Sequence, residues 1–114
     1  MQFISMKQCK AGNVYIGWTT VSTDEDAQVL CNKLVEKRLV ACAQVSQPIQ
    51  SIYQWNDELK TEKEVKVTLK FSAEKVEELT KTIVDIHPYD LPQWVYLEAE
   101  STPEYADWVD EQTR

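Results

Sequence analysis

The spacing of hydrophobic side chains changes between two periods along this chain, and the order of these changes constrains the fold more than any other feature. Val14, Ile16 and Trp18 alternate with their neighbours, which is typical of a half-buried strand. The next segment repeats its apolar residues at helical spacing; these residues are Ala27, Leu30, Cys31, Leu34 and Val35. The sequence therefore predicts a strand followed by an amphipathic helix.

Polar residues frame this first helix at both ends. Ser22 and Glu25, three positions apart, match a capping box, and acidic side chains suit the positive end of the helix dipole. Lys37 and Arg38 suit the opposite end. We expect a helix that starts after a Ser22 cap and ends near Arg38.

The middle of the chain has the pattern of three further strands. Apolar residues alternate over 39–46, and Pro48 is expected to close this strand. Residues 52–55 and 65–71 also have strand character, and the turn-like residues 56–60 between them predict a hairpin.

A second helix and a C-terminal unit follow the hairpin. Ser72 is expected to cap a helix that ends before Pro88. The apolar stripe of this helix consists of Val76, Leu79, Ile83 and Ile86. Two prolines stiffen the loop 87–92, a last strand is expected over 94–99, and Pro103 begins a terminal helix.

This order of elements predicts an α+β fold. We expect a ferredoxin-like split β-α-β sandwich over 14–114, with an antiparallel sheet and helices on one face, after a loose leader over 1–13. The other sheet face then carries more aromatic surface than a small monomer comfortably exposes, from Tyr53, Trp55, Trp94 and Tyr96. Self-association is the simplest way to cover it.

Charge and composition exclude several classes of partner. The net charge of -7 and the pI of about 4.7 disfavour nucleic acid and anionic membrane surfaces. The sequence has neither the apolar run of a secretory signal nor one long enough to span a membrane. Cys9, Cys31 and Cys42 form no C-x-x-C pair, so we expect no disulfide framework, no structural zinc and a cytoplasmic location.

His87 is the only histidine, and it lies in the stiffened loop. A zinc or copper site usually has two to four nitrogen or sulfur ligands, so His87 would need Cys42, Glu64 or a carboxylate from a neighbouring subunit. A histidine that hydrogen-bonds the loop, or one that exchanges protons, are the alternatives. The sequence leaves these roles open.

Four charged residues can share one face of a strand. Glu62, Glu64, Lys66 and Lys70 are separated by even numbers of positions, so their side chains point the same way. Glu64 and Lys70 are therefore candidates for holding a polar ligand. The alternative is a solvated charged face.

The sequence lacks the common patterns of catalysis. No serine lies in a G-x-S-x-G elbow, and no cysteine is paired in sequence with a base signature. Gly12 and Gly17 are the only glycines, so the chain has no phosphate-binding glycine loop. We therefore expect a binding or regulatory protein, not an enzyme.

Four blocks of sequence occur in a distinctive order. They are Leu39-Val40-Ala41-Cys42-Ala43, Ser51-Ile52-Tyr53-Gln54-Trp55, Glu64 to Lys70, and His87-Pro88-Tyr89-x-x-Pro92. At this spacing, over about residues 14–110, they resemble the CutA family. The resemblance implies a ferredoxin-like fold assembled as a tight homotrimer, in which long strands of neighbouring subunits pair edge to edge.

The resemblance also implies where a ligand would bind. It implies a cleft between subunits lined by Tyr53, Trp55, Glu64, Lys70, His87 and Tyr89. In bacterial members the proposed copper ligands are a cysteine and two adjacent histidines. Here the cysteine position falls at about Thr19 and the first histidine at Ile86, which leaves His87, and the family's Pro-Glu is Pro92-Gln93.

Two functions are consistent with these observations. The first is a divalent cation tolerance protein that takes part in the response to metal ions and binds copper or another divalent cation weakly. The alternative is a PII-like regulatory module that binds a small molecule or a protein partner in the cleft between subunits. The sequence establishes no cofactor, and copper or another divalent cation is the candidate.

Overall fold

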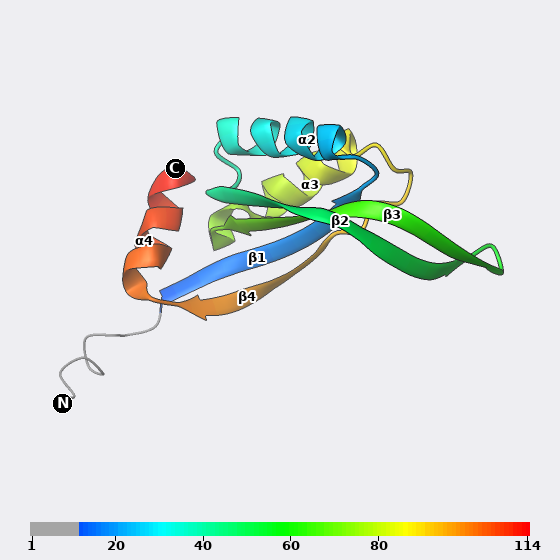
Figure 1. The fold of residues 1–114 in the computed structure, drawn as a ribbon. Coiled ribbons are helices and arrows are strands. Elements are labelled where there is room, and N and C mark those ends of the chain that lie inside the picture. The colour runs from blue at the N-terminus through cyan, green and yellow to red at the C-terminus, as the bar shows by residue number, and fades with distance from the viewer. Residues whose placement is uncertain (1–11) are drawn as a thin grey trace, which may run out of the picture.

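The computed structural model describes residues 12–114, which form a sheet, a layer of two crossover helices packed on it, and a C-terminal helix at its end (Figure 1). The elements are β1 (Gly12–Val21), α2 (Asp24–Glu36), β2 (Cys42–Trp55), β3 (Glu58–Phe71), the 3-10 helix η1 (Ala73–Lys75), α3 (Val76–Ile86), β4 (Val95–Ser101) and α4 (Pro103–Gln112). Strand β1 already includes Gly12 and Asn13, which we had assigned to the leader. The rest of the expected leader, residues 1–11, lies outside the described residues.

The sheet has the strand order β2-β3-β1-β4, and all neighbouring strands are antiparallel. Helix α2 connects β1 to β2, and α3 connects β3 to β4, so each crossover returns the chain to the sheet. This is the predicted ferredoxin-like split β-α-β arrangement. Strands β2 and β4 are left at the two edges.

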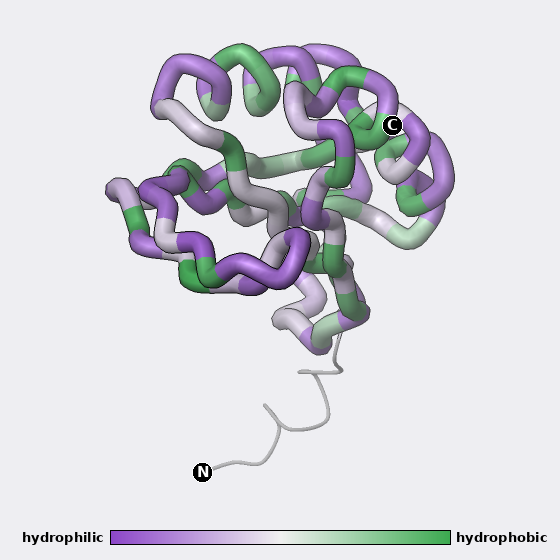
Figure 2. The backbone as a smooth tube through the Cα atoms, turned by 90° about the vertical axis from the view of Figure 1, so that its right-hand side faces the viewer, coloured by the Kyte–Doolittle hydropathy of each residue, from purple (hydrophilic) through white to green (hydrophobic). Residues whose placement is uncertain are grey.

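The main core lies between the sheet and the two crossover helices, which form a separate layer in Figure 2. Val67, Leu69 and Phe71 of β3 are fully buried there. Helix α4 packs instead on a smaller cluster around Val14 and Val109, at the end of the other sheet face. No helix within residues 12–114 has the length and apolar character needed to cross a membrane.

The cap of α2 is one residue later than predicted. Thr23 has extended backbone angles, and its Oγ1 accepts a hydrogen bond from the Asp26 N–H at 3.1 Å. Thr23-x-x-Asp26 fits the same three-residue spacing as Ser22-x-x-Glu25, so the sequence pattern alone does not distinguish them. Ser22 is left free to bind elsewhere.

Helix α3 begins differently from the prediction. Ser72 makes no capping hydrogen bond, and a turn of tighter 3-10 helix, η1, precedes α3. The Ser72 hydroxyl instead lies 3.1 Å from Thr113 Oγ1, at the end of α4. The predicted stripe is correct, because Leu79 and Ile83 are buried.

Strands β2 and β3 form a long hairpin whose outer part, residues 50–63, we call the arm. Strand β1 ends at Val21 opposite Val65, so beyond this point β2 and β3 pair only with each other. The arm projects from one end of the body in Figure 1.

The prediction that Pro48 closes a strand is wrong. The segments expected over 39–46 and 52–55 belong to one strand, β2, and Pro48 lies beside a break in its register with β3. Proline lacks an N–H donor, but an edge strand with a bulge tolerates this loss. The turn is also shorter than 56–60, because Asn56 and Asp57 both adopt positive φ, as a two-residue hairpin turn requires.

Trp94 and Tyr96 do not lie on the open sheet face, as we had expected. Their ring centres lie 5.8 and 6.5 Å from that of Phe71, on the helix side of the sheet. Trp94 packs against the core there, whereas Tyr96 is still 40% exposed at the edge. The Trp94 ring covers Gly17 so closely that a Cβ at Gly17 would collide with it, and Trp94 Nε1 donates to Thr80 Oγ1 of α3. Trp94 therefore closes the core beside β4.

Candidate functional site

His87 is buried at the end of α3, where it joins the loop after that helix to strand β1. Its Nε2 lies 3.0 Å from both the Thr20 carbonyl oxygen and Thr19 Oγ1. Its Nδ1 accepts a hydrogen bond from the Tyr89 N–H at 3.1 Å. Both ring nitrogens therefore have partners within the chain.

These partners define the protonation state of the imidazole. Because Nδ1 accepts from a backbone N–H, the proton of the neutral ring must lie on Nε2, which donates to the Thr20 carbonyl. Burial lowers the pKa of His87, against the opposing effects of the Thr20 carbonyl and the carboxylates of Glu64 and Asp26. The ring is held neutral, and its hydrogen bonds attach the loop after α3 to strand β1.

Tyr89 extends this hydrogen-bond network toward the surface. Its hydroxyl donates to Glu64 Oε2 at 2.8 Å and accepts from Ser22 Oγ at 3.0 Å. Burial is the main cause that raises the pKa of Tyr89, so the phenol stays protonated and can donate to Glu64. Through these two contacts Tyr89 joins the loop after α3 to Ser22, just before α2, and to Glu64 of β3.

The geometry around His87 is poorly suited to a metal ion. Within residues 12–114 no group of three or more His, Cys, Asp or Glu side chains could hold one. Thr19 does lie beside His87, as the resemblance implies for these two positions, but a threonine hydroxyl replaces the soft cysteine ligand. A metal on His87 would first have to displace the Tyr89 N–H or the Thr20 carbonyl.

Lys70 is remote from Glu64 within one chain. The two residues are six positions apart on β3, which corresponds to roughly 20 Å along a strand. Lys70 lies near α4, with its ammonium 5.9 Å from the centre of the Tyr105 ring. The predicted pairing of Glu64 and Lys70 around one ligand cannot occur within a single copy.

Tyr53 and Trp55 lie still farther out, near the tip of the arm. The Tyr53 hydroxyl donates to Glu62, and Trp55 is 48% exposed. The six predicted cleft residues thus form three groups, at the tip of the arm, at its base and beside α4. That they line one cleft stays a prediction, which requires residues from more than one copy.

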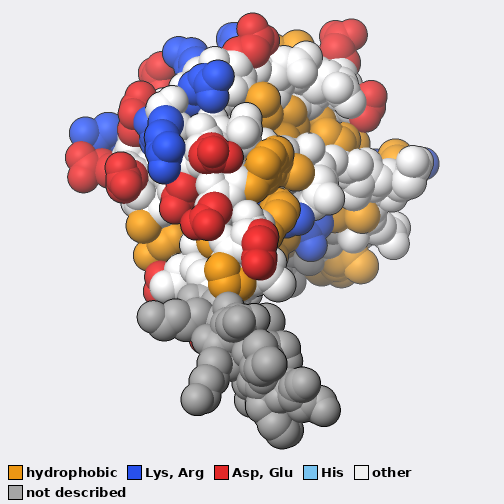
Figure 3. Space-filling model, turned by 90° about the vertical axis from the view of Figure 1, so that its left-hand side faces the viewer, with side chains coloured by type: hydrophobic (Ala, Val, Ile, Leu, Met, Phe, Trp, Pro, Cys, Tyr) orange, Lys and Arg blue, Asp and Glu red, His pale blue; other side chains and the backbone are white. Residues whose placement is uncertain are grey.

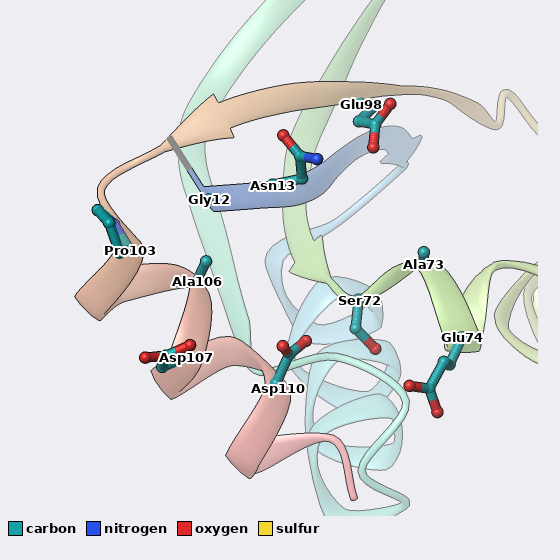
Figure 4. A pocket seen from close by; sticks show the side chains of 10 residues that line it. All are labelled: Gly12, Asn13, Ser72, Ala73, Glu74, Glu98, Pro103, Ala106, Asp107 and Asp110. Atoms are coloured by element: carbon teal, nitrogen blue, oxygen red, sulfur yellow. The ribbon is translucent and has the colours of Figure 1, made fainter. Parts of the chain in front are cut away.

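None of these six residues lines a hollow of about 510 Å³ that lies between α4, η1 and the strands β1 and β4 (Figure 4). Four carboxylates are among its lining residues: Glu74, Glu98, Asp107 and Asp110. Figure 3 shows acidic side chains gathered over this end of the molecule. No pattern in the sequence predicted this hollow.

Three partners of the loop were likewise not predicted from the sequence. Thr19 was considered only as a replaced ligand position, and Thr20 and Ser22 were not assigned to the site. Each lies 67 or 68 residues from its partner in the chain. No local pattern signals a contact over this distance.

Comparisons with known proteins agree with this fold. Residues 15–112 match the model of the CutA1 divalent ion tolerance protein family. The divalent-cation tolerance protein CutA of Thermus thermophilus is 35% identical over 95 residues, which cover 82% of this chain and 92% of that protein.

Solved structures show the same likeness. The divalent ion tolerance protein CutA1 of Ehrlichia chaffeensis has a TM-score of 0.85 at 34% identity, covering 90% of this chain and 96% of that one. The PII-like protein CutA of Nostoc sp. has a TM-score of 0.81 at 35% identity, covering 88% and 97%. Both likenesses extend over nearly all of the described fold.

Proposed function

The chain belongs to the CutA1 divalent ion tolerance protein family, and from this premise we propose that it is a non-enzymatic, PII-like binding module that works as a homotrimer. Its binding cleft lies between copies, where residues that are far apart in one chain come together. It takes a polar small molecule or a protein partner. Copper bound at His87 is not its main ligand.

The exposed arm is the observation that carries this proposal. Ile52 and Leu59 are 63% and 69% exposed, although they lie in a regular hairpin. A two-stranded hairpin is at best marginally stable in water, and exposed large apolar side chains add to this cost. A neighbouring copy that covers the arm removes both difficulties.

The two free edges of the sheet support assembly as a ring. Strand β4 exposes Val95, Tyr96 and Leu97 in succession at one edge, and β2 with its arm forms the other. Two different edges that pair between copies make a head-to-tail contact, which closes into a ring when the rotation permits. The number three comes from the family resemblance.

The contacts of His87 argue against copper as the main ligand. Both of its nitrogens are already hydrogen-bonded, and the position beside it holds Thr19. Copper would gain one nitrogen ligand, and its binding would break a hydrogen bond that attaches the loop after α3 to the rest of the chain. By contrast, Glu64 and Tyr89 at the base of the arm can meet Lys70 of another copy, which offers both charges to a polar ligand.

The thiols support a non-enzymatic role in a reducing compartment. Burial is the main cause that raises the pKa of Cys31 to about 11, so this thiol is protonated and a poor nucleophile at neutral pH. Cys31 and Cys42 are both free thiols. The proposal therefore keeps the cytoplasmic location expected from the sequence.

Native mass spectrometry with and without substoichiometric copper tests the proposal. We expect a trimer, and we expect any bound copper to be retained in His87→Gln. Circular dichroism of His87→Gln checks that this variant is folded. A thermal-shift screen of anionic metabolites beside metal salts then identifies the ligand class, because a ligand of the native state raises the melting temperature.

Two outcomes would overturn the proposal. A monomer at micromolar concentration would remove the cleft between copies. One copper per subunit, lost in a folded His87→Gln variant, would restore copper as the main ligand and His87 as its site.

A further inference from the structure

The register of β2 against β3 changes at one point, between the body and the arm. Val45 pairs with Val67 and Pro48 pairs with Val65, so Ser46 and Gln47 together oppose the single residue Lys66. This is a β-bulge, which bends a strand and interrupts its ladder of backbone hydrogen bonds.

The side chain of Ser46 fills the interrupted ladder. Its Oγ accepts a hydrogen bond from the Lys66 N–H at 2.9 Å and donates to the Gln47 carbonyl oxygen at 2.7 Å. A hydroxyl thus takes the place of the backbone carbonyl that Lys66 would meet in a regular ladder. Ser46 ties the two strands together where the arm leaves the body.

The extra residue also decides which side chains the arm presents on each face. Val45 faces the helices, because it pairs with the core residue Val67. With strict alternation, Tyr53 and Trp55 would face the same way as Val45. The bulge shifts the alternation by one, so they lie on the open face instead, and Ile52 takes the helix side.

We propose that the bulge at Ser46 and Gln47 sets the orientation of the arm, so that Tyr53 and Trp55 face the open sheet face of a second copy of this chain. This inference rests on the proposed homotrimer and adds its positioning residue, Ser46. Without the bulge, the arm presents Ile52 and Gln54 to that copy instead.

Charge complementarity favours a second copy as the occupant. On the same face as its two aromatic residues the arm carries Glu58, Lys60 and Glu62, a set with a net negative charge. The open face of the body carries Lys66, whose ammonium lies 5.8 Å from the centre of the Trp18 ring, together with the exposed Leu97. Acidic and aromatic groups on the arm thus match basic and apolar groups on the body.

The first test compares three serine variants by sedimentation velocity and hydrogen exchange. Ser46→Ala should raise the exchange rate of the Lys66 amide, and the concentration at which the assembly dissociates, each by about 2- to 10-fold, as loss of one hydrogen bond predicts. Ser46→Thr keeps the hydroxyl and should restore both values. Ser101→Ala is the matched control and should change neither, because Ser101 also donates to the carbonyl oxygen of the next residue but lies at the end of β4 far from the arm.

The second test deletes Gln47, which removes the bulge. We expect assembly to be lost while the circular dichroism and the hydrogen-exchange protection of α2 and α3 persist, because the body does not depend on which way the arm faces. If the deletion variant does not fold, the serine series decides alone.

The outcomes separate this inference from the proposed function. A wild-type monomer contradicts the homotrimer itself. A wild-type trimer that dissociates at the same concentration as Ser46→Ala keeps the proposed function and overturns the role of Ser46. Equal loss of assembly in Ser101→Ala also overturns it, because the effect would not be specific to the bulge.

Discussion

Strand β3 runs through two regions with opposite surroundings. In the body Val67, Leu69 and Phe71 are fully buried, whereas Leu59 on the arm is 69% exposed. Both regions have regular antiparallel pairing, so hydrogen bonding does not distinguish them. Burial does: helices cover the body, while within one copy the arm is paired only along its own two strands. The arm is therefore the least buried part of the sheet within one copy, and in the proposed assembly it is the part that a second copy covers.

Phe71→Ala should have the largest effect on the body. Removing this buried ring leaves a cavity in the main core and should lower the free energy of unfolding by about 3–5 kcal/mol. Urea unfolding followed by circular dichroism measures it. Leu59→Ala on the arm is the comparison and should change the unfolding of the body by less than about 0.5 kcal/mol. Similar losses in both variants would show that body and arm do not differ in this way.

Trp55→Ala should weaken assembly and leave the body intact. A large aromatic at a buried interface commonly contributes about 2 kcal/mol or more to association. Trp108→Ala is the matched control, because Trp108 is 40% exposed on α4, away from the arm. Sedimentation velocity over a dilution series gives both values. An assembly that survives dilution equally in the two variants would argue against the arm as the interface.

Thr23→Ala should have a moderate effect within the body. Loss of the observed cap should cost about 1 kcal/mol and should speed exchange of the Asp26 amide. Ser22→Ala should leave that amide protected, because Ser22 binds Tyr89 instead. The opposite result would return the cap to Ser22.

Lowering the pH should have the smallest effect on the free energy of unfolding, and it acts through the hydrogen bonds of His87. Burial lowers the pKa of His87 in the folded chain, so below about 6.5, the pKa of a free histidine, the unfolded chain binds protons more readily than the folded one. The stability contributed by His87 is therefore complete above this pH and declines as the pH falls through it. Urea unfolding of wild type and His87→Asn between pH 5 and 7.5 should show a shallower slope in the variant; equal slopes would contradict this role.

The sequence predicted the body better than the arm. The stripe of α3 is correct because an amphipathic helix records its own buried face in its spacing. Pro48 misled the prediction of β2, since a proline closes most strands but is tolerated at a bulge on an edge. Trp94 and Tyr96 were placed on the wrong face, because an aromatic residue looks the same in sequence whether it covers a core or an interface.

The candidate site was predicted in part. His87 was placed in a stiff loop, and one of the roles left open for it, hydrogen bonding within the loop, is the one observed. Tyr89 was named only among the cleft residues, and its contact with His87 was not predicted. The His87 partners Thr19 and Thr20 could not be identified by local patterns, since only the packing of the chain brings them to the loop.

The order of elements, and with it the split β-α-β fold, was determined by the sequence alone, because hydrophobic periodicity and turn residues act over a few neighbouring positions. The tertiary structure decided the rest. It set the contacts of His87, which cross 67 or 68 residues, and the face on which Trp55 lies, which one extra residue in β2 reverses. Contacts between distant segments depend on how whole elements pack, and a single residue in a strand shifts every side chain beyond it.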